Sequence, residues 1–389
     1  MLRRRFLPLC LAAPAAALQR PRLEPVPAEA PAPASRSAGR RWKLRYLHED
    51  DKWAALLADF CAPSAERAIA ALRLESESRE RGAMLVTRDA GASWKEIPFS
   101  EKPLSLFSVN ADHIWAVSEK SLWISAESGY AWRKGALPKT PRRYRPFQVH
   151  FIDPLRGWAF GPGRAFYATS DGGASWKPVA EAQSLQLKDE NTVWTSMAFL
   201  DSRHGLIAGF SDPRLNEEER LPGWMLPERA ARRKLTPVTT IAGETKDGGT
   251  SWKFSVTSAF GRAVRLRAGG DRGLAVYHYS ESFSFPSEVY RLDFRTGASR
   301  TVFRRPDFWV HDALLLDDGG ILLAAIQTVG AMRASPVPGK LRMLHSPDGV
   351  QWSEMAVDYR AEGHRAFLAS PAPGVLWAAT DAGCILSLA

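Results

Sequence analysis

The sequence has few of the residues that build metal and nucleophile sites. Its 389 residues include three cysteines and eight histidines. Only Cys61 and Cys384 lie beyond the N-terminal segment, and two thiols cannot by themselves complete a tetrahedral zinc site. The histidines show no HExxH spacing, and there is no GxSxG elbow, P-loop or dinucleotide-binding glycine motif. We therefore predict no metal and no cofactor, and an enzyme is less expected than a binding protein.

Long apolar runs are also absent beyond the N-terminus. Residues 1–18 begin with a basic stretch and continue with an Ala- and Leu-rich one, which predicts an export signal cleaved near Ala17. The arginines at 3–5 resemble a twin-arginine motif, and ordinary Sec export is the alternative. A lipoprotein anchor at Cys10 is disfavoured because Leu-Pro-Leu precedes it. We expect a periplasmic or secreted protein with no transmembrane span.

Residues 19–40 are rich in proline and alanine and predict a flexible linker. The remaining residues, 41–389, are long enough for one large β domain.

What the sequence does contain is a repeat of the form Ser/Thr, x, Asp, x, Gly, x, Ser/Thr, Trp. Residues 87–94, 169–176 and 245–252 match it fully, 125–132 has Glu for Asp, and 346–352 is one residue short. The Asp-Gly centre favours a turn, and the Trp offers a large apolar face for packing. Each copy therefore predicts a β-hairpin. The residues at the Asp, Gly and Trp positions are Asp89, Gly91 and Trp94; Glu127, Gly129 and Trp132; Asp171, Gly173 and Trp176; Asp247, Gly249 and Trp252; and Asp348 and Trp352.

The spacing of the repeats predicts four-stranded blades. The first two intervals between box tryptophans each fit one blade, and the later two are about twice as long. An insertion at 211–237 explains one long interval, and a degenerate box at 290–297 explains the other. We expect an all-β, seven-bladed propeller, with six or eight blades as alternatives. Residues 42–47 form a strand without a neighbour, whereas the chain end lacks a strand after a box-like turn at 380–383, so the N-terminal strand should close the last blade.

A second pattern precedes two of the boxes. Residues 151–161 and 199–209 both read Phe, apolar, Asp, three residues, Gly, apolar, which predicts an inner hairpin. The boxes resemble the Asp-box, or BNR, repeat of β-propellers, where it joins the two outer strands of a blade. Together the two patterns resemble the photosystem II assembly and stability factor family and its relatives in non-photosynthetic bacteria, over most of residues 42–389. The resemblance implies an assembly or stability factor, without implying photosynthesis.

Arginine clusters mark candidate contact surfaces. The formal net charge is +10, and Arg142, Arg143, Tyr144 and Arg145 form a basic run between the second and third blades. Such a run attracts acidic surfaces. Solvated loop charge is the alternative. Within the insertion, Trp224 is a candidate partner contact, or else it folds back onto its blade.

Two functions remain open from the sequence. The first is a monomeric scaffold that binds an acidic protein surface, such as that of a membrane-associated complex, and not nucleic acid, because aromatics are not interleaved with the arginines. The second is a sialidase-like glycoside hydrolase or a glycan-binding propeller. It lacks support because no Phe/Tyr-Arg-Ile-Pro motif precedes Asp89. Cys61 and Cys384 either form a disulfide or remain buried free thiols.

Overall fold

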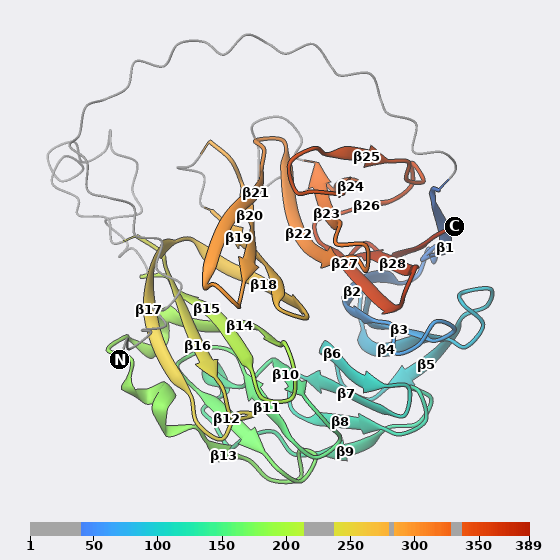
Figure 1. Cartoon of the computed structure of the whole chain (residues 1–389). Coiled ribbons are helices and arrows are strands. Elements are labelled where there is room, and N and C mark those ends of the chain that lie inside the picture. Colours follow the sequence, from blue (N-terminus) through green and yellow to red (C-terminus); the bar gives the residue numbers. More distant parts are fainter. Residues whose placement is uncertain (1–39, 214–236, 280–283, 328–336) are drawn as a thin grey trace, which may run out of the picture.

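The computed structural model describes residues 40–213, 237–279, 284–327 and 337–389. Seven antiparallel sheets surround a central axis as the blades of a propeller (Figure 1). The expected fold and blade number are therefore confirmed. In the described residues no helix is long and apolar enough to cross a bilayer.

Each blade is listed here from its inner to its outer strand. Blade one contains β2 (Ala54–Cys61), β3 (Ala68–Glu75), β4 (Glu80–Thr87) and β5 (Lys95–Phe99). Blade two contains β6 (Pro103–Asn110), β7 (His113–Ser118), β8 (Leu122–Ser125) and β9 (Arg133–Gly135). Blade three contains β10 (Gln148–Phe151), β11 (Gly157–Phe160), β12 (Phe166–Thr169) and β13 (Lys177–Pro178). Blade four contains β14 (Thr192–Phe199), β15 (Gly205–Ser211), β16 (Thr239–Thr245) and β17 (Lys253–Phe260).

The remaining blades follow the same order. Blade five contains β18 (Arg262–Gly269), β19 (Arg272–His278), β20 (Ser287–Asp293) and β21 (Ala298–Arg304). Blade six contains β22 (Phe308–Leu315), β23 (Ile321–Gln327), β24 (Gly339–Ser346) and β25 (Ser353–Met355), with β26 (Glu362–Gly363) paired to the start of β24. Blade seven contains β27 (Ala366–Ala372), β28 (Val375–Thr380), β29 (Cys384–Leu388) and, outermost, β1 (Trp42–Leu47).

Strand composition follows position in the blade. The second strands β3 and β23 read AIAALRLE and ILLAAIQ and are buried along most of their length, because neighbouring blades cover both of their faces. The outer strands β9 and β13 are only three and two residues long and are largely exposed. Short outer strands leave little free edge for pairing with other chains.

The alternation of strands gives the ring two distinct faces. The first turn of each blade and the Asp-box turns lie on one face, which we call the box face. The second turn of each blade and the connections between blades lie on the other, which we call the connection face. The inner hairpins predicted at 151–161 and 199–209 are present, with the carboxylates of Asp153 and Asp201 accepting backbone N–H bonds in their turns.

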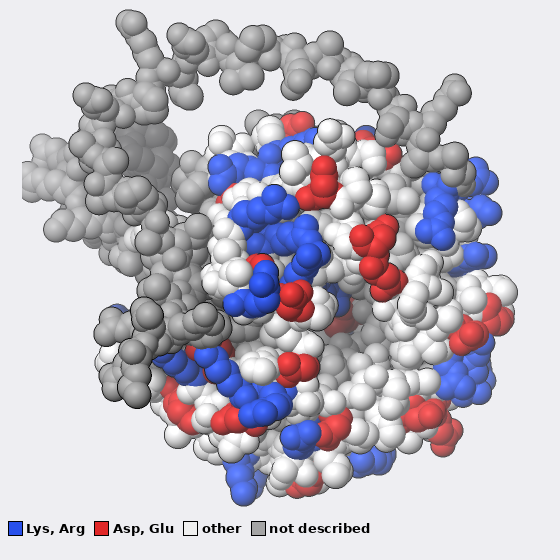
Figure 2. Space-filling view, viewed as in Figure 1, with Lys and Arg blue, Asp and Glu red and all other residues white. Residues whose placement is uncertain are grey.

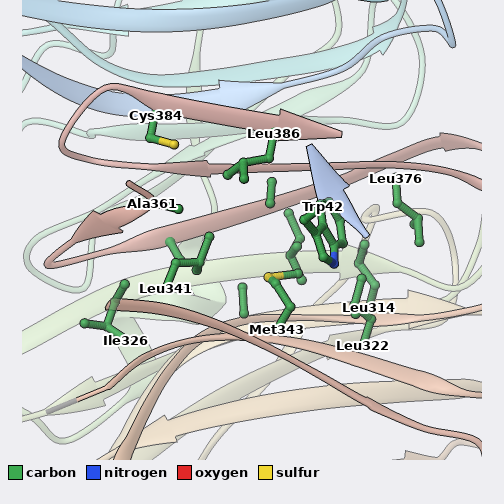
Figure 3. Packing of buried hydrophobic residues seen from close by; sticks show 14 residues of the cluster. Trp42, Leu314, Leu322, Ile326, Leu341, Met343, Ala361, Leu376, Cys384 and Leu386 are labelled. Carbon is green, nitrogen blue, oxygen red and sulfur yellow. The ribbon is translucent and has the colours of Figure 1, made fainter. Parts of the chain in front are cut away.

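The N-terminal strand closes the ring, as predicted. β1 pairs with β29, and Trp42 lies opposite Leu388. The backbone N–H of Trp42 also donates to the carbonyl of Ala356 in blade six, at 2.9 Å. Its side chain is 1% exposed and packs among Leu314, Leu322, Leu376 and Met343, between blades six and seven (Figure 3). Strand β1 therefore completes blade seven and also binds blade six.

One detail of the closure was predicted wrongly. The turn at 380–383 is not an Asp box at the end of the chain, because strand β29 follows it and completes a third strand of blade seven. The missing fourth strand is the one that β1 supplies.

Candidate functional site

The Asp boxes are self-contained turns. In the first box, the hydroxyl of Thr87 donates to Asp89 Oδ1 at 2.7 Å and accepts the N–H of Gly91 at 3.0 Å, while the Ser93 N–H and hydroxyl donate to Asp89 at 2.9 and 2.5 Å. The boxes at Asp171 and Asp247 repeat this arrangement. In these three boxes both carboxylate oxygens are therefore occupied within their own turn, which gives the aspartates a structural task. In the shorter box, Asp348 Oδ1 accepts from the Ser346 hydroxyl and from the N–H groups of Val350 and Gln351.

Charged and hydroxyl side chains form a belt inside the central channel. Five of the inner strands carry a β-bulge, and the paired residue that follows it is Asp59 in β2, Ser105 in β6, Ser196 in β14, Arg265 in β18 and Asp312 in β22. Most of these side chains bond to the backbone of the next blade. The bonds run from the Leu106 N–H to Asp59 at 2.8 Å, from Ser105 to the Phe147 carbonyl at 2.7 Å, from the Leu266 N–H to Ser196 at 2.9 Å, and from the Leu368 N–H to Asp312 at 3.0 Å.

Asp312 is the best-satisfied member of this belt. Arg267 binds its two oxygens at 3.0 and 2.6 Å, and the N–H groups of Ala313 and Leu368 supply one further bond to each oxygen. Burial raises the pKa of Asp312, but Arg265 and Arg267 outweigh burial and hold it below its ordinary value. Asp312 is thus a fixed anion that joins blades.

This arrangement does not favour glycoside hydrolysis. Asp312 has no free lone pair to accept a proton from substrate or water. Asp59 accepts one N–H at each oxygen, from Phe60 and Leu106, and so keeps lone pairs, but a single available carboxylate does not make the pair that glycoside hydrolysis uses. No tyrosine or glutamate is among the described residues that line the channel cavity. The Tyr and Glu pair of a sialidase is therefore not assembled there.

The basic run at 142–145 lies on the connection face. Arg142–Tyr144 form the single-turn 3-10 helix η1, which links β9 to β10. Arg145 is half-buried and donates to the backbone carbonyl of Glu119. Arg143 lies over the ring of Tyr144 at 4.8 Å, and both Arg142 and Arg143 are exposed. The run therefore divides into one anchored arginine and two that face solvent.

A groove lies beside these arginines. It has a volume of about 640 Å³ and is lined by Leu104, Glu119, Lys120, Arg142, Arg145 and Pro146. Glu119, its one acidic residue, is already paired with Arg73 at 3.2 Å and with Lys102 at 3.4 Å. Among the described residues neither Arg142 nor Arg143 has a salt-bridge partner. The groove therefore keeps unpaired positive charge.

A second basic cluster was not expected from the sequence. Basic side chains gather over blade five, near β19, β20 and β21 (Figure 2). Burial and the like charges of the nearby Arg272 and Arg300 lower the pKa of Arg291. The three residues are separated in the sequence and meet only because their strands pair.

Other predicted features have simpler outcomes. Trp224 and most of the insertion lie outside the described residues; the chain leaves β15 after Ser211 and re-enters at Thr239, on the connection face. Cys61 and Cys384 are free thiols, and burial raises the pKa of each to about 12. In the part of the chain that the structure describes, no group of three or more His, Cys, Asp or Glu is placed to hold a metal ion.

Comparison with known proteins supports the predicted resemblance. No family model matches the chain. A stretch of 137 residues is 32% identical to the photosystem II assembly lipoprotein Ycf48 of Synechococcus sp. (strain CC9902). That stretch is 31% of this chain and spans about 40% of the length of its relative.

Solved structures agree on the fold. YCF48 bound to D1 peptide matches with a TM-score of 0.54 and 15% identity, covering 88% of this chain and 96% of that one. YCF48 from Cyanidioschyzon merolae matches with a TM-score of 0.54 and 14% identity, covering 89% of this chain and 98% of that one. The chain is thus similar to photosystem II assembly factors in part of its sequence and in its propeller fold.

Proposed function

We propose that this protein is an exported, non-enzymatic propeller that docks an acidic segment of a protein partner in the groove beside Arg142 and Arg143. A groove of about 640 Å³ carries this proposal, because Arg142 lines it and the exposed Arg143 is the next residue in the chain. Neither arginine has a salt-bridge partner in the described part of the chain. An acidic segment would supply the missing counter-charges.

The groove suits a peptide rather than a small ion. Leu104 and Pro146 give it apolar walls, whereas Arg142, Arg145 and Lys120 give it positive charge. Arg145 is held in place by its bond to the Glu119 carbonyl, so it needs little ordering when a partner binds. A segment that alternates acidic and apolar side chains would satisfy both kinds of wall.

The similar proteins support a protein-binding role. One of them is described as bound to D1 peptide, and another as an assembly lipoprotein. We extend only the peptide-binding ability to this chain, and we expect its partner to be exposed to the periplasm, for example as part of a membrane-associated complex. The extended connection face, from which the insertion departs, would add further contacts.

The proposal is tested by capturing partners with tagged protein in the periplasm of its source organism after mild crosslinking. The key variant combines Arg142→Glu and Arg143→Glu, and leaves Arg145 intact because it is part of the fold. Arg203→Glu with Arg295→Glu, two exposed arginines on the box face, is the matched control with the same change in net charge. Arg291→Glu with Arg300→Glu tests the cluster on blade five.

Each variant has a defined consequence. We expect one specific partner to be captured by the wild type, the box-face control and the blade-five variant, and lost with the groove variant. A partner that is retained by the groove variant, or lost only with the blade-five variant, would move the docking site elsewhere.

A further inference from the structure

A cavity inside the channel provides a second candidate site, separate from the groove. Its volume is about 350 Å³, which is near the lower end for small-molecule pockets. It extends from the charged belt to residues near the C-terminal ends of the inner strands, such as Cys61 and Ser108, and so lies toward the box face. The groove lies on the opposite, connection face.

Arg265, in the wall of this cavity, pairs with Asp312 by charge but makes no hydrogen bond among the described residues. Its counterparts at the bulges of β2, β6, β14 and β22 bond to the backbone of the next blade, whereas none of the described residues receives a hydrogen bond from Arg265. Its closest anion is Asp312, 3.4 Å from its Nε. Asp312 already accepts two bonds at each oxygen without Arg265, so Arg265 acts on Asp312 through its charge and not through a hydrogen bond.

The position of the Arg265 side chain leaves it able to donate. Its Nε is buried beside Asp312 and makes no hydrogen bond with the described residues, whereas 23% of the side chain as a whole is exposed. A guanidinium donates in a planar fork that matches a carboxylate, and buried donors without acceptors are uncommon in folded proteins. The exposed part of the guanidinium can therefore donate to an acceptor inside the cavity.

An aromatic wall shares the cavity with Arg265. Three rings, one each from blades two, three and four, form a row: Phe107, His150 and Phe199. The centroid of the His150 ring lies 4.5 Å from that of Phe107 and 5.6 Å from that of Phe199. Burial lowers the pKa of His150 to about 3, so its ring is uncharged at neutral pH and adds to the apolar surface. Aromatic side chains stack on flat ligands in such walls.

We propose that the channel cavity binds a small carboxylate with an aromatic or other flat apolar group, the carboxylate pairing with Arg265 and the ring lying against Phe107, His150 and Phe199. The carboxylate belongs either to a free aromatic acid or to the C-terminal residue of a peptide. Asp59 and Asp312 also line the cavity, and their negative charges oppose an anion. Arg267 pairs with both oxygens of Asp312, which leaves Asp59 as the main opposing charge. The site does not depend on the proposed docking groove.

Calorimetric titration of the full chain with phenylacetate tests this site, with phenylacetamide as the uncharged probe. A pair of N-acetylated tripeptides ending in Phe, one with a free and one with an amidated C-terminus, distinguishes the two sources. We expect phenylacetate to bind and the amide to bind at least about tenfold more weakly, as loss of one charged hydrogen-bonded pair implies. Tighter binding of the free-acid peptide than of phenylacetate would identify the natural ligand as a peptide C-terminus. Binding of phenylacetate with no binding of either peptide would identify it as a free aromatic acid.

The variants make the assignment specific. Arg265→Gln should weaken phenylacetate binding at least about tenfold, whereas Arg295→Gln on the outside of blade five and the Arg142→Glu, Arg143→Glu variant should not change it. If Arg265→Gln folds poorly, Arg265→Lys is the alternative variant. It keeps the positive charge but loses the paired N–H donors of the guanidinium, so it should still weaken phenylacetate binding. Asp59→Asn should strengthen it. Equal affinity for phenylacetate and phenylacetamide, or for wild type and the Arg265 variants, would overturn the proposal.

Discussion

The guanidinium of Arg267 holds both carboxylate oxygens of Asp312, at 3.0 and 2.6 Å, across the boundary between blades five and six. The same carboxylate accepts the N–H of Leu368 in blade seven. A second bond runs from Arg267 to the carbonyl of Leu368, at 2.9 Å. Three blades therefore meet at one buried ion pair, and this pair fixes the wall of the channel on the side opposite the aromatic residues.

Loss of the Asp312 charge should destabilise the ring. In Asp312→Asn, Arg267 keeps its place beside the channel but loses its anion. We expect a loss of about 3 kcal/mol, the lower part of the range for breaking a buried pair, because Arg267 is partly exposed. Denaturant unfolding measures it, with the exposed Asp317→Asn as a control that should change stability by less than about 0.5 kcal/mol. Equal unfolding of the two variants would show that the ion pair does not hold the blades.

Truncation of Trp42 should open the ring closure. The indole fills the space between blades six and seven, and no smaller side chain replaces those contacts. Trp42→Ala should cost about 3–5 kcal/mol, the usual range for a buried aromatic. Lys43→Ala in the same strand, with an exposed side chain, is the matched control. The closure would carry less of the stability than we infer if the two variants unfolded at the same denaturant concentration.

Two glycines that both have positive φ angles allow the cost of backbone strain to be measured apart from the cost of a steric clash. Gly249 has a φ of +84°, and an added Cβ would lie 2.0 Å from Cζ2 of Trp158, whereas Gly270 has a φ of +60° and nothing within 4 Å. Gly270→Ala should therefore cost only the strain of a left-handed alanine, about 1–2 kcal/mol. Gly249→Ala must also displace a buried tryptophan and should unfold at a clearly lower temperature. Similar melting temperatures would contradict this close packing of box against blade.

The Asp boxes should make the free energy of unfolding depend on pH in the acid range. Hydrogen bonds from the Ser93 hydroxyl and N–H and from the Thr87 hydroxyl lower the pKa of Asp89 to about 2, and the equivalent bonds do the same for Asp171 and Asp247. An unfolded aspartate titrates near about 3.9. Since the folded pKa is the lower one, this stabilisation is present above pH about 4 and is lost as the pH falls through about 2.

A variant with Asn at Asp89, Asp171 and Asp247 isolates this effect. The variant should be less stable than the wild type at pH 7, and the gap between their urea midpoints should narrow as the pH is lowered from about 4 toward about 2. A gap that stays constant over this range would mean that the ionised carboxylates do not stabilise the turns.

Much of the fold could be predicted because its signals are local. Each full box places a hydroxyl, an Asp, a Gly and a Trp within eight residues, so the turn at Asp89 can be predicted from the sequence alone. The role of β1 could be inferred from the unmatched strand at Trp42. The turn at 380–383 misled because a turn between second and third strands and a box between third and fourth use the same Asp and Gly residues.

The charged belt of the channel and the groove beside Arg142 could not be predicted from local sequence patterns. Asp59, Arg265 and Asp312 come from different blades, and the bulge that aligns them is set by strand pairing rather than by a repeated spacing. Likewise, nothing in the run at 142–145 distinguishes the anchored Arg145 from the exposed Arg142. That difference arises from the Glu119 carbonyl, which a separate hairpin places beneath it.

The docking groove is tested most directly by measuring the affinity of the captured partner for purified wild-type protein and for the Arg142→Glu, Arg143→Glu variant, at two salt concentrations. We expect the variant to bind at least about tenfold more weakly, and the wild-type affinity to fall as salt rises, because exposed charge pairs are screened. The box-face variant with Arg203→Glu and Arg295→Glu should bind as the wild type does. Equal affinity of the wild type and the groove variant, with the same dependence on salt, would contradict the account.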